Sequence, residues 1–154
     1  ILAYLIITST EAYTQEFTLP AFIDDITSCD IDLDGDLDII CICQILNYEE
    51  DSIFIFYNNG ASGFQRKGYH YPNVNFILCG CVNEDSFPDI VSRYSSDVYF
   101  IPNFGENGFG AVIPIVEMSG TLDVSKIIDI NLDNWNDIIY TNTSGEYWGI
   151  LGNI

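Results

Sequence analysis

Apolar residues in this chain gather in short runs that polar clusters separate. The runs IICICQIL (39–46), DSIFIFY (51–57) and DVYFI (97–101) are rich in β-branched and aromatic residues. Asn, Gly, Pro and Ser cluster between such runs, and a helical 3.6-residue periodicity is almost absent. This pattern predicts strands joined by turns, so we expect an all-β protein. The run 39–46 is apolar on both faces, which predicts an inner strand sandwiched between sheets.

An internal repeat runs through the chain with a period of about 50 residues. Its clearest part is an acidic stretch that begins at Asp30 (DIDLDGDLDII), at Cys81 (CVNEDSFPDIV) and at Asp129 (DINLDNWNDII). An apolar run, a polar turn and a second β-rich run follow each stretch. Residues 2–20 resemble 53–72, so the N-terminus is expected to be the second half of an earlier repeat; the alternative is the remnant of a signal peptide.

Each repeat predicts four strands, and four strands in about 50 residues are typical of a β-propeller blade. We therefore expect one β-propeller-like domain over residues 1–154, with about three four-stranded blades. The expected boundaries are a half repeat at 1–20 and repeats at 21–72, 73–118 and 119–154, the last lacking its final strand.

About three blades fall short of the four to eight of a closed propeller, and open sheet edges promote aggregation. Two explanations remain open at this point. Either the chain is part of a longer one, or the N-terminal strands of one chain complete the unfinished blade of another. The second contact is heterologous, so it would produce a closed ring or an open filament.

The net charge of the chain limits the classes of partner that it can bind. The 154 residues include 23 acidic and four basic ones, for a net charge of −19. No basic patch is available to neutralise phosphates, which excludes nucleic acid as a partner. No apolar stretch reaches the roughly 18 residues of a membrane span. Because such a charge repels itself, bound cations are expected as structural components.

The acidic stretches have the spacing of a calcium loop. Calcium takes six to eight oxygen ligands, and D-x-D-x-D-G-x-x-D makes alternate side chains converge while the glycine lets the chain turn. The first loop offers Asp30, Asp32, Asp34 and Asp38 with the backbone carbonyl of Asp36; the third offers Asp129, Asn131, Asp133 and Asp137 with the carbonyl of Trp135.

The EF-hand reading of this spacing is excluded. An EF-hand loop needs a carboxylate at its twelfth position and a helix on each side. The twelfth residue from Asp30 is Cys41, which lies in a strand-like run, and the closing carboxylate comes at the ninth position.

The second loop is weaker. Cys81, Asn83 and Ser86 replace two aspartates and the glycine, which leaves Asp85 and Asp89. We therefore expect calcium in the first and third loops and a weak or empty site in the second, with Asn83, Asp85 and Asp89 as its ligands.

The loop DIDLDGDLDII, its following apolar strand and the turn NNGASGF resemble the FG-GAP/VCBS repeat of integrin α-subunit heads and many secreted propellers. The resemblance covers nearly the whole chain. The first loop is a specific match, the third has Asn at two positions, and the second departs from the motif. The resemblance implies calcium between the first two strands of a blade and a secreted or cell-surface protein.

Five cysteines, an odd number, suggest a secreted protein with one thiol left over. They lack the spacing of a zinc site. The pairing stays open between a Cys29–Cys41 link across the first loop and links from Cys41/Cys43 to Cys79/Cys81 between blades. A glycosylation sequon begins at Asn142.

The sequence favours a binding or structural protein over an enzyme. His70 is the only histidine and has no evident catalytic partners, and the cysteines lie in apolar runs with few cations nearby. Glycoside hydrolysis by a carboxylate pair is not excluded by spacing, but most carboxylates belong to the metal loops. Aromatic residues that could stack on sugars, though more simply core, are Trp135, Trp148, Tyr69, Tyr71 and Tyr99.

The function expected from the sequence is a calcium-stabilised, non-enzymatic adhesion or structural protein outside the cell. Its partners would be other copies, joined by strand exchange, or the missing blades of a longer chain, with glycans or surface proteins as ligands. The alternatives are a lectin-like glycan-binding module and the scaffold part of a larger polysaccharide-active enzyme.

Overall fold

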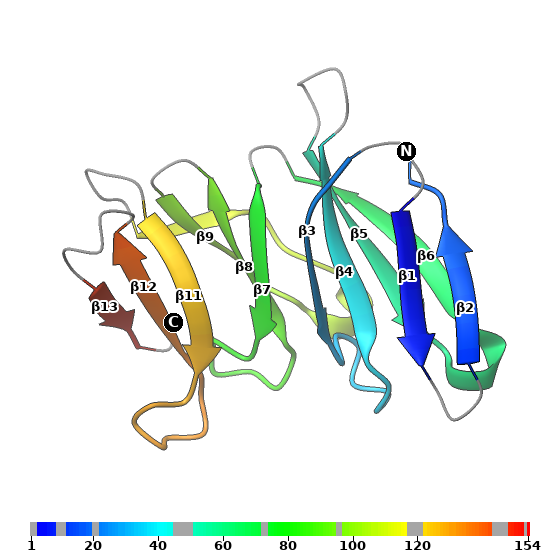
Figure 1. Cartoon of the computed structure of the whole chain (residues 1–154). Coiled ribbons are helices and arrows are strands. Elements are labelled where there is room, and N and C mark those ends of the chain that lie inside the picture. The colour runs from blue at the N-terminus through cyan, green and yellow to red at the C-terminus, as the bar shows by residue number, and fades with distance from the viewer. Residues whose placement is uncertain are drawn as a thin grey trace.

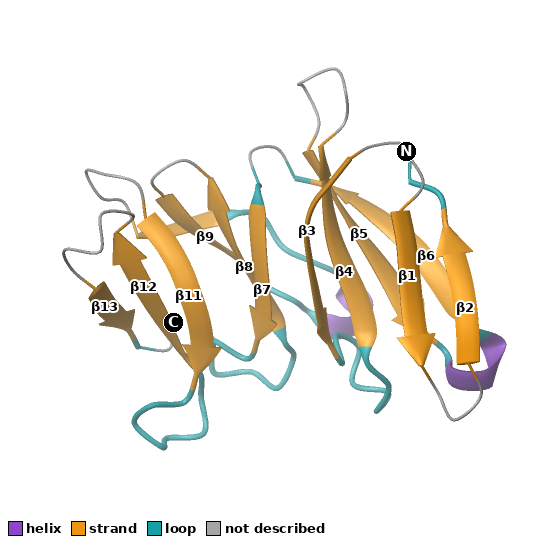
Figure 2. Ribbon diagram, viewed as in Figure 1, coloured by secondary structure: helices purple, strands orange, loops and turns teal. Residues whose placement is uncertain are grey.

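The computed structural model describes residues 3–8, 12–19, 22–44, 51–71, 74–94, 97–116, 122–142, 148–152 and 154. Within this part, strands are the dominant elements, accompanied by two single-turn 3-10 helices (Figures 1 and 2). The prediction of an all-β chain is confirmed. The strands are β1 (Ala3–Thr8), β2 (Ala12–Phe17), β3 (Phe22–Cys29), β4 (Asp38–Gln44), β5 (Asp51–Asn58), β6 (Phe64–His70), β7 (Phe76–Gly80), β8 (Asp89–Tyr94), β9 (Asp97–Ile101), β10 (Ile113–Val116), β11 (Leu122–Ile128), β12 (Asp137–Asn142) and β13 (Trp148–Leu151).

Strands that follow one another in the chain pair antiparallel, so each sheet is a meander. The described strands form the hairpin β1–β2, a first sheet β3–β4–β5–β6, a second sheet β7–β8–β9–β10 and a third sheet β11–β12–β13. Among the described residues the first and second sheets have four strands each, and the third has three.

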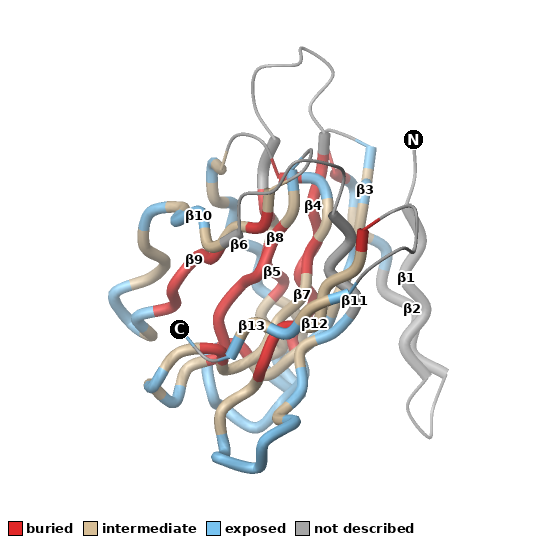
Figure 3. The backbone as a smooth tube through the Cα atoms, turned by 90° about the vertical axis from the view of Figure 1, so that its left-hand side faces the viewer, coloured by how far each residue is buried: buried red, intermediate tan, exposed pale blue. Residues whose placement is uncertain are grey.

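The sheets stack face to face, from β1–β2 at the right of Figure 1 to β11–β13 at the left. Buried residues follow β4, β5, β8 and β9 through the interior (Figure 3). In β4 all residues from Ile39 to Cys43 are buried, since one face packs toward the hairpin and the other toward the second sheet. The expectation of a strand buried on both faces is confirmed for this segment.

The Gly-Phe turns place an aromatic ring between neighbouring layers. Phe64 meets Phe17 of the hairpin with ring centroids 5.7 Å apart, and Phe109 meets Tyr69 of the first sheet at 5.0 Å. Gly63 and Gly108, which precede the two rings, both have φ 78°, a conformation that favours glycine. These turns are therefore structural.

A disulfide joins the first and second sheets. It links Cys29 at the end of β3 to Cys79 in β7, with Cα atoms 6.3 Å apart. Both pairings left open by the sequence are wrong. Cys41 lies opposite Ile26 in the strand register rather than near Cys29. Cys41 and Cys43 are free, because their side chains face the hairpin rather than the second sheet.

The next pair of sheets meets at the corresponding position without a disulfide. Gly80 pairs with Asp89 as Cys29 pairs with Asp38, so the two residues are equivalent in the repeat. A Cβ atom on Gly80 would lie 2.8 Å from Cγ2 of Ile127, so the glycine packs directly on β11. Close apolar packing here replaces the covalent link of the first interface.

The disulfide should contribute measurably to stability. Replacing Cys29 and Cys79 together by serine is expected to lower the free energy of unfolding by about 2–4 kcal/mol. Urea titration at neutral pH without reductant measures this loss of stability. The control is Cys81→Ser, because Cys81 is free. Five free thiols in the unreduced wild-type protein would contradict the assignment.

Candidate metal centre

The first acidic loop connects β3 to β4 and is closed by the pair Cys29–Asp38. Leu33 and Gly35 take left-handed backbone conformations, with φ 62° and 96°. The turn at Gly35 was expected from the sequence, whereas the strained turn at Leu33 was not. Strands on both sides confirm that the loop is not an EF-hand.

Side-chain oxygens of this loop accept hydrogen bonds from its own backbone. Asp30 Oδ2 accepts from the Gly35 amide at 3.0 Å, and Asp32 Oδ1 accepts from the Asp34 amide at 3.3 Å. Asp34 Oδ1 accepts from the Asp36 amide at 2.9 Å. These bonds curl the chain so that carboxylates gather on the inside of the loop.

The closing carboxylate, Asp38, is fully buried. Its Oδ2 accepts from the Ile31 amide at 2.9 Å, and its Oδ1 accepts from the Asn58 amide at 2.7 Å. Burial raises the pKa of Asp38, although the two backbone donors oppose the rise. Asp38 therefore joins the start of the loop to the end of β5.

Three carboxylates of this loop form a cluster. Asp30, Asp32 and Asp38 each place an oxygen within 4.8 Å of the others. Asp30 Oδ1 is buried and has no hydrogen-bond partner among the described residues. Partial burial, followed by the charge of Asp34, raises the pKa of Asp32. A buried carboxylate oxygen without a partner is costly, and hard carboxylate oxygens are the ligands that calcium prefers.

Two other candidate ligands of the first loop lie outside this cluster. Asp34 and Asp36 are exposed. The Asp36 carboxylate lies over the turn after β5, 3.2 Å from where a Cβ of Gly60 would be. For Asp36 the sequence nominated the backbone carbonyl rather than the side chain, and that nomination stays a prediction.

The third acidic loop has the same backbone path. Leu132 and Asn134, at the positions of Leu33 and Gly35, have φ 63° and 75°. Asp129 Oδ2 accepts from the Asn134 amide at 2.9 Å, and Asp137 Oδ2 accepts from the Ile130 amide at 3.0 Å. Asparagine, which tolerates the left-handed region, thus substitutes for glycine.

The third loop differs in its charge. The Asn131 amide nitrogen donates to Asp133 Oδ2 at 2.9 Å, at the position where the first loop has a second carboxylate. Asp133 Oδ1 accepts from the amide of Trp135 at 2.9 Å. Among the described residues, only the first loop has a cluster of three carboxylates.

The second acidic loop departs further from the conformation and charge of the first. None of its residues, all of which are described, has a positive φ. The Asn83 amide nitrogen donates to Asp85 Oδ2 at 2.9 Å and to Asp89 Oδ1 at 3.5 Å. An amide hydrogen therefore lies where a cation would bind. Burial raises the pKa of Asp89 to about 6.

Sequence reasoning missed two asparagines that support the loops. The Asn58 amide binds Asp38, and the Asn103 amide binds Asp89 Oδ1 at 2.9 Å. The Asn103 side chain also donates to the carbonyl of Ile31 at 2.8 Å, which ties the second repeat to the first loop. The signal was available, because each asparagine stands two residues before a glycine in NNGASGF and NFGENGF.

The aromatic residues nominated for sugar stacking do not form one surface. Tyr69 and Tyr71 pack against the core between the first and second sheets. Tyr99 and Trp135 are half-buried in the second sheet and the third loop, and Trp148 is exposed on β13.

The remaining reactive groups are separate from the loops' carboxylate cluster. His70 is exposed at the end of β6. Burial raises the thiol pKa of Cys41 to about 12 and that of Cys43 to about 11. Asn142 of the sequon is 8% exposed, and the rest of the sequon lies outside the described residues. The burial of Asn142 disfavours its glycosylation. The glycosylation itself stays a prediction from the sequence.

Neither of the two 3-10 helices in the described residues is long and apolar enough to cross a membrane.

The raised carboxyl pKa values predict a pH dependence for the cation-free protein. Because Asp89 and Asp38 bind protons more tightly when folded, the free energy of unfolding falls as pH rises from about 4 to 6. In EDTA, the Tm should be several degrees higher at pH 5 than at pH 7.5. Each 1 kcal/mol in the free energy of unfolding corresponds to about 2–4 °C in Tm for a chain of this size. Asp89→Asn should reduce this slope and the exposed-site variant Glu84→Gln should not; equal slopes in both would contradict it.

Comparison of the chain with family models, with curated proteins and with solved structures finds no match.

Proposed function

We propose that the chain is a calcium-stabilised, extracellular structural or adhesion protein built from β-propeller-type repeats of the FG-GAP/VCBS kind. The observation that carries the proposal is the unpartnered, buried Oδ1 of Asp30 within a cluster of three carboxylates. The Cys29–Cys79 disulfide supports an extracellular location, since disulfides persist in oxidising compartments.

Calcium would be held in the first loop by Asp30, Asp32 and Asp38, with Asp34 and the carbonyl of Asp36 as further oxygens. Its charge would offset the repulsion within the cluster. Because the loop joins β3 to β4 and Asp38 also binds the end of β5, a cation on this loop would hold these three strands of the first sheet together. In the second loop the amide of Asn83 offsets the two remaining carboxylates, so that loop needs a cation least.

Calcium titration by calorimetry tests this proposal. The wild-type protein should bind about two ions, and each site should add about 2.7 kcal/mol to its stability when calcium is at 100 times the Kd of that site. Asp30→Asn should remove the tighter site and Asp129→Asn the weaker one, while the control Asp85→Asn leaves both. Absence of saturable binding at micromolar to millimolar calcium would overturn the proposal.

The stacking of the sheets supports the propeller-type arrangement and a further partner. Ile40, Ile53 and Ile55 of the first sheet are fully buried against the second sheet. Their repeat equivalents in the second sheet, Val91, Val98 and Phe100, are buried against the third.

In the third sheet the equivalent positions are Ile139, Trp148 and Ile150. Trp148 is 69% exposed and Ile150 44% exposed among the described residues. A sheet of the same type fits this face, supplied by another copy through strand exchange or by further blades of a longer chain. Exposed contiguous apolar faces of this kind mark interaction sites.

Light scattering over a concentration series tests self-assembly. The wild-type chain should associate as its concentration rises, and the double variant Trp148→Ser/Ile150→Ser should shift association to at least about tenfold higher concentration, because a buried apolar side chain contributes about 1.5–3 kcal/mol. Tyr94→Ser, which changes an exposed residue of the second sheet, serves as the control. A wild-type protein that stays monomeric at every concentration would rule out self-assembly.

A further inference from the structure

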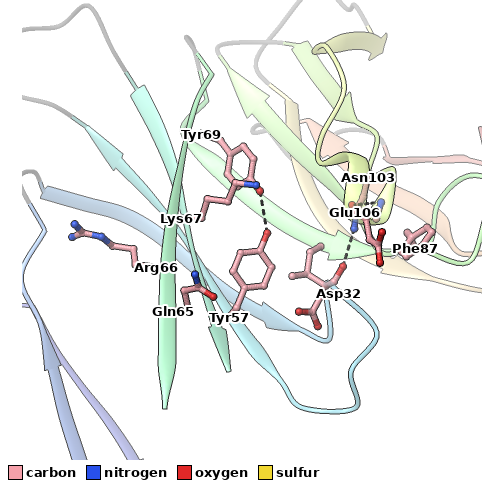
Figure 4. Close-up of a pocket in the computed structure, with 11 residues that line it drawn as sticks. Asp32, Tyr57, Gln65, Arg66, Lys67, Tyr69, Phe87, Asn103 and Glu106 are labelled. Carbon is pink, nitrogen blue, oxygen red and sulfur yellow. Dashed lines mark hydrogen bonds between the residues drawn. The ribbon is translucent and has the colours of Figure 1, made fainter. Parts of the chain in front are cut away.

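A pocket of about 670 Å³ lies between the first and second sheets, beside the first acidic loop (Figure 4). Its size falls within the range of small-molecule sites in proteins. Side chains from three separate parts of the chain line it: Asp32 of the loop, Tyr57, Gln65, Lys67 and Tyr69 of β5 and β6, and Glu106 of the turn after β9.

The alternation of β6 determines which side chains face the pocket. Gln65, Lys67 and Tyr69 lie on one face of the strand, as alternate residues do. Arg66, between them, points away from the other labelled residues in Figure 4. Its Nη1 donates to the Thr18 carbonyl at 3.2 Å, and its guanidinium lies over the Phe54 ring. Among the described residues that line the pocket, Lys67 is therefore the one whose positively charged side chain faces it.

A pair of tyrosine hydroxyls provides an unused donor. The hydroxyl oxygens of Tyr57 and Tyr69 lie 3.1 Å apart, so one donates to the other. A hydroxyl donates one hydrogen bond and accepts two, and neither hydroxyl has another hydrogen-bond partner among the described residues. One hydroxyl hydrogen and several lone pairs of the half-buried pair thus remain for a ligand.

The remaining polar groups of the pocket include both hydrogen-bond donors and hydrogen-bond acceptors. Lys67 and Gln65 supply N–H donors, while Asp32 and Glu106 supply carboxylate acceptors, and all four are exposed. Two negative charges and one positive charge, in a chain of net charge −19, disfavour a phosphorylated or carboxylated ligand. This density of charged and amide groups also disfavours an apolar ligand.

A ligand rich in neutral hydroxyl groups matches this pattern, because each hydroxyl both donates and accepts. We propose that the pocket binds a short, neutral oligosaccharide. The carbohydrate would sit between the two sheets, with its hydroxyls bonded to the tyrosine pair, Lys67 and Glu106. The proposal rests on the Tyr57–Tyr69 pair, Lys67 and Glu106, which are not candidate calcium ligands, whereas Asp32 is shared by the pocket and the carboxylate cluster.

Calorimetry or NMR titration with defined sugars tests the proposal. The probes are the neutral trisaccharides maltotriose, cellotriose, mannotriose and xylotriose, with trigalacturonate and sialyllactose as anionic comparators, each with calcium and with EDTA. At least one neutral sugar should bind with Kd of about 1 mM or lower, corresponding to about −4 kcal/mol.

Matched variants locate the site. Lys67→Ala and Glu106→Gln should each weaken binding of that sugar about tenfold, the effect of about 1.4 kcal/mol. Lys126→Ala and Glu16→Gln, which change exposed residues outside the pocket, should leave it unchanged. Circular dichroism checks that all four variants fold. No binding of any neutral probe, binding of anionic probes alone, or equal losses in pocket and control variants would each overturn the proposal.

Discussion

The rest of the structure depends on one recurrent contact, the buried aspartate that closes each acidic loop. Asp38, Asp89 and Asp137 are all buried, and each accepts the backbone amide seven residues before it. Burying a carboxylate is costly unless donors surround it, so the chain must return to this point and present its amides. That requirement determines the length of the loop and the place where the second strand of each sheet begins.

This contact separates the folding of the loop from its capacity to bind a cation. The second loop keeps Asp89 and its backbone donors although it has lost two aspartates and the glycine. The first loop adds a carboxylate cluster and an unpartnered oxygen to the same framework. At the candidate ligand positions the first loop has four carboxylates, the third has three and the second has two. The amide of Asn83 or Asn131 occupies the place of a carboxylate in the second and third loops.

The contacts between sheets also recur in position but differ in chemistry. A disulfide joins the first two sheets where close packing of Gly80 on Ile127 joins the next two. The side chain of Asn103 adds a hydrogen bond from the second repeat to Ile31 of the first loop. The stacking of the inner strands determines where neighbouring sheets touch, whereas the residues at that contact differ between the two interfaces.

Local features of this protein were predictable from sequence. The strands β4, β5 and β9 and the turn at Gly35 depend on residues close together in the chain, whose side-chain alternation and turn preferences are local properties. The buried character of Ile39–Cys43 followed from the same alternation. The acidic loop could be located, and its EF-hand alternative excluded, by spacing alone.

The tertiary structure decided which distant residues meet. Cys29 pairs with Cys79 rather than with Cys41, because sheet stacking brings β3 to β7 while strand register turns Cys41 to the opposite face. The same stacking places Asn103 on the first loop and closes the pocket around Lys67 and Glu106. Sequence alone determined the units of this protein, and packing of the units determined its contacts, since residues about one repeat apart are brought together only when sheets stack.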